Sequence, residues 1–126
     1  MSKNMQAEAE SFRKEIETVI EEDELDEVLS ATIDIALAST DADWATDCLI
    51  RLARHADTDV RGNAMIGFAH LAGRFGELSQ EKVAPVLRAG LRDSKSHVRA
   101  QAEAALDELG ERLAWTLLDD EALAEE

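Results

Sequence analysis

Apolar residues recur every three or four positions along most of this chain, which is the period of an amphipathic α-helix. A first helix is expected over about residues 6–22, with an apolar stripe of Phe12, Ile16, Val19 and Ile20 on one face. No segment alternates apolar and polar residues over the length of a strand. The pattern therefore predicts an all-α protein.

The same period, together with helix-capping residues, predicts five further helices. They are expected over about residues 24–38 and 42–55, from the capping run 57–59 to about 75, over 80–91, and from a cap at Ser94 or Ser96 to a stop at Gly110. The runs 39–43 and 57–59 and Ser79 supply N-cap residues, and Gly76 is expected to end the fourth helix. On the second helix the positions expected to face inward are Leu25, Val28, Leu29, Ile33, Ala36 and Leu37. A last amphipathic piece follows, with Leu113, Trp115, Leu117 and Leu118.

One stretch of the chain occurs twice, at an offset of 38 residues. Val60 and Arg61 match Val98 and Arg99, and the agreement continues through the apolar positions after them. Self-similarity at a period of about 20–50 residues is typical of stacked helical repeats. Such stacks usually serve as surfaces for binding another macromolecule.

These repeats resemble HEAT repeats, and the resemblance extends from about residue 44 to about residue 110. The resemblance implies a short right-handed α-solenoid of about three antiparallel helix pairs in one domain, residues 1–126. Its expected parts are a divergent acidic pair (1–40), two repeats (41–76 and 77–110), and a capping segment with a tail (111–126). It also implies that Arg61 and Arg99 pair, in a structural role, with turn acids of their own or a neighbouring repeat; Asp57 and Asp59 are near Arg61, and Asp93 is near Arg99.

Charge is the second informative property of the sequence. The formal net charge is −15, from 28 acidic residues and 13 lysines and arginines, and residues 1–47 alone hold 14 acids and three bases. Such a field repels nucleic acid and anionic membranes and attracts a basic protein. The alternative is that the acidity only keeps the protein soluble.

Few residues suggest chemistry. Cys48, the single cysteine, lies on an apolar stripe and is expected to be a buried small hydrophobe. His55, His70 and His97 form no His-Glu pair of the kind that binds iron in some helical-repeat enzymes, and His70 is expected at the surface. We therefore expect a protein that is not an enzyme and that uses no metal or cofactor. A helical-repeat lyase is a remaining alternative.

The favoured function is an acidic inhibitor of a basic protein, of the kind represented by bacterial immunity proteins that cover a toxin nuclease. The alternative is a generic scaffold or adaptor that binds through an apolar patch such as Leu113, Trp115, Leu117 and Leu118. Trp44 is either an aromatic anchor for the partner or a residue buried between the first two helix pairs. The protein is expected in the cytoplasm, with a monomer favoured and no binding to nucleic acid or membrane. The expected partner-binding residues are Asp23, Glu24, Asp26, Glu27, Asp34, Asp41, Asp43, Trp44 and Asp47.

Overall fold

The computed structural model describes residues 2–115, with side chains from Met5 onward, and this part of the chain is helical without a strand. The all-α prediction is therefore confirmed for these residues. No helix in the described range is both long and apolar enough to cross a membrane. The helices are α1 (Ser2–Glu22), α2 (Leu25–Ala38), α3 (Ala42–Leu52), α4 (Thr58–Phe75), α5 (Gln80–Leu91) and α6 (Ser96–Leu113).

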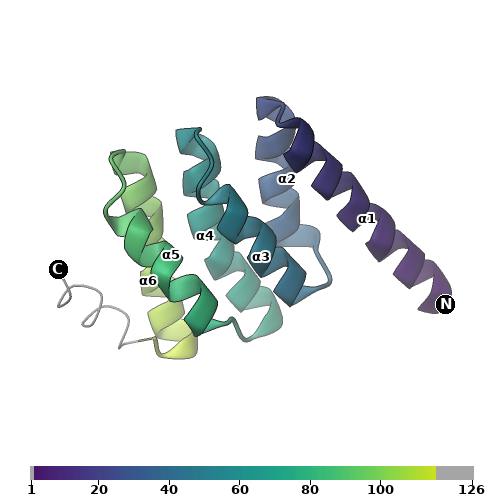
Figure 1. The fold of residues 1–126 in the computed structure, drawn as a ribbon. Helices are drawn as coiled ribbons and strands as arrows, with labels where there is room; N and C mark the ends of the chain where they lie inside the picture. Colours follow the sequence, from purple (N-terminus) through teal and green to yellow (C-terminus); the bar gives the residue numbers. More distant parts are fainter. Residues whose placement is uncertain (1, 116–126) are drawn as a thin grey trace.

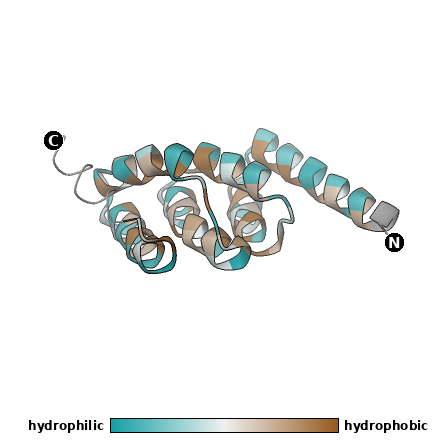
Figure 2. Cartoon of the chain, turned by 90° about the horizontal axis from the view of Figure 1, so that it is seen from below, coloured by the Kyte–Doolittle hydropathy of each residue, from teal (hydrophilic) through white to brown (hydrophobic). Residues whose placement is uncertain are grey.

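The helices lie in two layers, with α1, α3 and α5 in front of α2, α4 and α6 in the view of Figure 1. Helix α4 is central, because it packs against α2, α3, α5 and α6. Hydrophobic and hydrophilic residues are interspersed along each helix, as Figure 2 shows. The apolar faces meet between the layers in one core, whose largest fully buried side chain is Phe68 of α4.

Side-chain caps fix several helix starts where the sequence predicts them. Asp41 accepts a hydrogen bond from the Trp44 amide at 3.1 Å, and Ser79 accepts one from the Lys82 amide at 3.3 Å. These bonds satisfy amides that have no partner within the first helical turn. Gly76 ends α4 with a φ of 74°, a left-handed conformation that glycine adopts at little cost.

Several predicted helix ends are wrong. Helix α1 already begins at Ser2, and α3 ends at Leu52, three residues before His55. Helix α6 continues through Gly110 to Leu113, and its left-handed C-cap residue is Ala114, with a φ of 58°. Neither predicted serine caps α6: its N-cap is Lys95, which makes no side-chain cap bond. A glycine inside a helix only weakens it, so Gly110 did not mark the end.

The predicted inward face of α2 is partly wrong. Val28 and Ala36 are buried, but Leu25, Ile33 and Leu37 are 44%, 48% and 55% exposed. The physical reason is position: α2 is the end helix of its layer, with α4 on one side and no helix of residues 2–115 on the other. Helix α4, flanked by both α2 and α6, buries far more of its surface.

The segment after α6 contributes to the core through Trp115, which is 5% exposed and belongs to the buried cluster. Leu113 is half-buried against the same cluster. Leu117 and Leu118, the other two members of the predicted apolar piece, lie outside the described residues. Trp115 is therefore not available as an exposed adaptor surface.

Candidate functional site

A groove of about 390 Å³ lies between α1 and α2, at the acidic end of the molecule. We call it the acidic groove. Its apolar lining consists of Phe12, Ile16, Val19 and Ala31, and its polar lining of Glu15, Asp26, Glu27, Ser30 and Asp34. Helix α1 contributes Phe12, Glu15, Ile16 and Val19 to this lining, and α2 contributes the other five residues.

The four carboxylates of the acidic groove are exposed and not neutralised. Within residues 5–115, none of them takes part in an ion pair or a side-chain hydrogen bond. A concave apolar surface ringed by free carboxylates attracts cationic groups and also offers them a surface for their aliphatic stems. Chemically, the acidic groove is suited to binding lysine or arginine side chains.

Three of the nine predicted partner-binding residues thus come together here: Asp26, Glu27 and Asp34. The sequence prediction missed Glu15, which joins them from α1. A signal for it existed, since Glu15 lies three residues after Phe12 and four before Val19 on the predicted apolar stripe. The position of Glu15 on the stripe indicates a binding role only once the packing of α1 against α2 is known.

Two predicted residues lie in the turn between α1 and α2. Asp23 has a φ of 55°, and its carboxylate lies 2.6 Å from Nε2 of His55. Nδ1 of His55 accepts a hydrogen bond from the Asp57 amide at 3.0 Å, so Nε2 carries the ring hydrogen and donates it to Asp23. Glu24 is exposed at the N-cap of α2 and makes no cap bond.

Asp41 and Trp44 lie where α3 meets α1 and do not line the acidic groove, although Trp44 contacts its lining residue Phe12. Nε1 of Trp44 donates to Glu17 at 3.0 Å, and the ring packs edge-on against Phe12 at 5.9 Å between centroids. The Arg13 guanidinium lies 5.5 Å above the same ring and 3.3 Å from the Asp41 carboxylate. Trp44 is half-buried and serves to join these two helices.

Glu17 is the centre of that junction. Arg51 donates to it at 2.7 Å, alongside Trp44. Burial acts to raise the pKa of Glu17, but the hydrogen bonds from Arg51 and Trp44 together hold this pKa below its usual range. Glu17 is therefore ionised at neutral pH and already satisfied by groups of this chain.

The last two predicted residues lie on a different side of α3. The Asp47 carboxylate pairs with Lys82 of α5 at 3.2 Å, and both side chains are about half exposed. Asp43 lines a separate depression together with Glu77 and Ser79. The nine predicted residues therefore divide among several places, and only the acidic groove collects three of them.

The position of the acidic groove agrees with the distribution of charge along the chain. Residues 48–115, which form the remainder of the described structure from late α3 onward, carry nine acids and ten bases. The negative field of the described part therefore comes from residues 1–47, that is, from α1, α2 and the start of α3.

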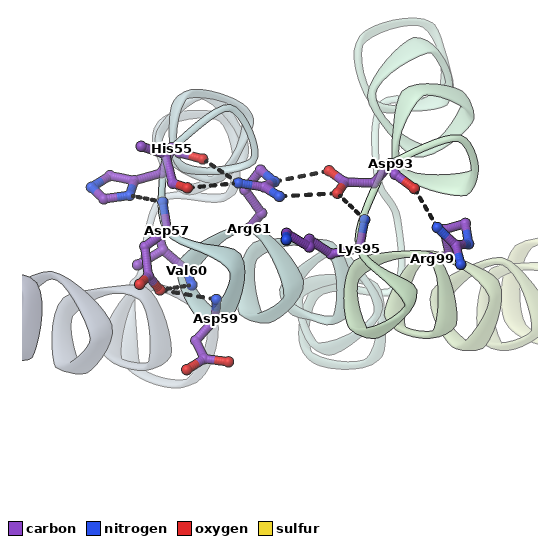
Figure 3. Close-up of polar contacts among 9 residues, drawn as sticks. His55, Asp57, Asp59, Val60, Arg61, Asp93, Lys95 and Arg99 are labelled. Atoms are coloured by element: carbon purple, nitrogen blue, oxygen red, sulfur yellow. Dashed lines mark hydrogen bonds and ion pairs between the residues drawn. The ribbon is translucent and has the colours of Figure 1, made fainter.

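The duplicated Val-Arg motif has a structural role, as predicted, but Arg61 pairs with Asp93 and not with the nearby Asp57 or Asp59. Figure 3 shows Arg61 of α4 reaching the loop before α6, where Nε and Nη2 donate to Asp93 at 2.8 and 2.9 Å. Its Nη1 donates to the carbonyls of His55 and Ala56 at 3.0 and 2.9 Å. Arg99 donates to the Asp93 carbonyl at 2.6 Å.

Cys48 and His70 also lie where the sequence places them. Cys48 is 1% exposed, and burial raises the pKa of its thiol, with the Arg51 hydrogen bond acting against it. His70 is exposed on α4. Within the described residues, no three histidine, cysteine or acidic side chains are grouped so that they could hold a metal ion.

Comparisons with known proteins found no family model, no curated protein and no solved structure that matches this chain.

Proposed function

We propose that this protein is a binding module for a basic protein partner, built as a short right-handed α-solenoid of about three antiparallel HEAT-like pairs. The observation that carries the proposal is the acidic groove, where four carboxylates without a cationic partner surround an apolar floor. Leaving these charges uncompensated at one end costs stability through self-repulsion. A cationic partner would remove that cost on binding.

The form of this function that we favour is inhibition of a toxin nuclease. Nucleases bind a polyanion through a cationic surface, so an acidic protein of this size can cover that surface and prevent substrate binding. The activity is binding rather than catalysis, and it needs no cofactor.

The test is calorimetric titration against the product of the adjacent gene at low and moderate salt. The groove variant Glu15→Gln/Asp26→Asn/Asp34→Asn removes three carboxylates that can each form an ion pair with the partner. Because each desolvated ion pair contributes a substantial fraction of a kcal/mol or more to the binding free energy, the variant should weaken binding at least about tenfold. The matched control removes three exposed acids of α6, Glu103, Asp107 and Glu111, and should bind nearly as well as the wild type. Binding of the wild type should also weaken as salt rises.

Three results would contradict this proposal. They are an adjacent-gene product that is not basic, no binding at micromolar concentration and low salt, and equal loss of binding in the groove variant and the α6 control. Equal loss would show that only the total charge matters.

An adaptor is the second candidate, and the exposed Leu25, Ile33 and Leu37 on α2 favour it. An adaptor of this kind would bind its partner with little dependence on salt. It would also keep binding after the acidic groove is neutralised.

A further inference from the structure

Helix α2 carries an apolar row beside the acidic groove. Leu25, Leu29, Ile33 and Leu37 follow one another at intervals of four residues, and all but the half-buried Leu29 are 44% exposed or more. Single exposed apolar residues are ordinary on protein surfaces, whereas a contiguous apolar patch marks an interaction site. We call these four residues the α2 row.

The spacing of the α2 row determines what it fits. Residues four apart form the ridge that interlocks with the matching ridge of a second helix, the commonest mode of helix packing, with axes crossing at about 50°. At a rise of about 1.5 Å per residue, the row is about 18 Å long. That is the length of a partner helix of about three turns.

The carboxylates next to the row determine the chemistry of the partner. Asp26 lies three residues before Leu29, and Asp34 lies three residues before Leu37, so each aspartate is a neighbour of a row residue on the helix surface. Both also line the acidic groove. A helix packed on the row would therefore bring its flanking side chains against these carboxylates.

Charge also argues against a second copy of this chain as the occupant. Two copies packed through the α2 row would bring their own Asp26 and Asp34 carboxylates together at an interface with little water. Juxtaposed like charges are strongly unfavourable there. The net charge of −15 adds a long-range repulsion.

We propose that α2 is the docking helix for an amphipathic, basic helix of the partner protein. Aliphatic side chains of that helix, four residues apart, pack on the α2 row, and its lysines or arginines bind Asp26 and Asp34. The inference rests on the proposed function for the basic character of the partner and adds the kind of element that is recognised.

The probe is a synthetic 18-residue peptide with leucine at every fourth position and lysine at the flanking positions. The control peptide has the same composition in shuffled order, so that it carries the same charge without an apolar ridge. Binding is followed by fluorescence anisotropy of the labelled peptides. The ordered peptide should bind at least about tenfold more tightly than the shuffled one.

Variants then separate the apolar contribution from the charge. Ile33→Ala/Leu37→Ala should weaken binding of the ordered peptide at least about tenfold, whereas Met5→Ala, which removes another exposed apolar side chain, should leave it unchanged. Circular dichroism checks that each variant is folded. In the unmodified protein, the methyl resonances of the α2 row should shift on binding and those of Met5 should not.

Three outcomes would overturn this inference. If both peptides bind equally well and only Asp26→Asn/Asp34→Asn weakens them, recognition is electrostatic alone, and the proposed function stands while the docking helix does not. If neither peptide binds at low salt, the docking helix is likewise rejected, and the adjacent-gene titration decides the proposed function separately. If light scattering finds a dimer that Ile33→Ala/Leu37→Ala abolishes, a second copy covers the row.

Discussion

Removing Arg61 should destabilise the protein more than removing any exposed arginine. The side chains of Arg61 and Asp93 are only 15% exposed, and they are joined by two hydrogen bonds of 2.8 and 2.9 Å. In Arg61→Met, the Asp93 carboxylate keeps the Lys95 amide at 3.0 Å but loses its cation. The carbonyls of His55 and Ala56 lose the donor that Arg61 provides.

The size of the effect follows from those losses. Breaking one side of a buried ion pair costs about 3–5 kcal/mol, and the remaining exposure of this pair places it at the lower end, at about 3 kcal/mol. That is a large share of a typical stability of about 5–15 kcal/mol. With a urea dependence of about 1–3 kcal/mol per molar, the unfolding midpoint should fall by roughly 1–3 M.

The assay is urea unfolding followed by circular dichroism, with Arg54→Met as the control. Arg54 is exposed in the segment between α3 and α4, and its replacement should change stability by less than about 0.5 kcal/mol. A double-mutant cycle with Asp93→Asn should give a coupling energy of about 2 kcal/mol. A loss below about 0.5 kcal/mol in Arg61→Met, or no coupling in the cycle, would refute the assignment of Arg61 as a tie between α4 and the loop before α6.

Three further predictions concern acid, glycines and the thiol. The Arg61 hydrogen bond holds the pKa of Asp93 below its usual range, so its stabilisation is complete above the unfolded pKa of about 3.9 and is lost as the pH falls through the folded value. Urea midpoints of the wild type and Asp93→Asn should therefore converge at strongly acid pH, and a constant gap would contradict this. Gly110→Ala should raise the unfolding free energy by about 0.5–1 kcal/mol, since a methyl group there meets nothing within 4 Å. Gly90→Ala should lower it by about 1–3 kcal/mol, because the added carbon would lie 2.8 Å from the end of the Met65 side chain and 3.0 Å from Cβ of Ala102, which has no rotatable side chain to move aside; equal effects of the two substitutions in thermal unfolding would be inconsistent with this packing. Cys48, 1% exposed, should react with Ellman's reagent only as fast as the protein opens, and a rapid reaction in the native state would show that the thiol is accessible.

Much of the fold could be predicted because local signals sufficed. The cap at Asp41, the stop at Gly76 and the bounds of α5 each depend on residues within one or two turns of the helix end. The structural role of Arg61 also followed from a short motif, but its partner did not: Asp57 and Asp59 were expected beside it, whereas it pairs with Asp93, 32 residues away.

The exposure of the α2 row could not be predicted in the same way. Periodicity identifies apolar positions on a helix, but burial depends on how many helices surround it, and α2 is the end of its layer. The same limit applies to the acidic groove. Glu15 and Asp26 lie on different helices, and only the packing of α1 on α2 brings them together.

The central position of α4 has a consequence for how the protein opens. Helix α1 packs mainly on α2, whereas α4 contacts four other helices, so the amides of α1 should exchange with deuterium long before those of α4. Arg74 of α4 donates to the carbonyls of Ala36 and Ser39, which ties the end of α2 to the slowly exchanging part. The proposed binding surface therefore includes both α1, whose amides exchange first, and α2, whose end is tied to the slowly exchanging α4. A bound partner would be detected as slowed exchange in α1, at amides that it need not touch.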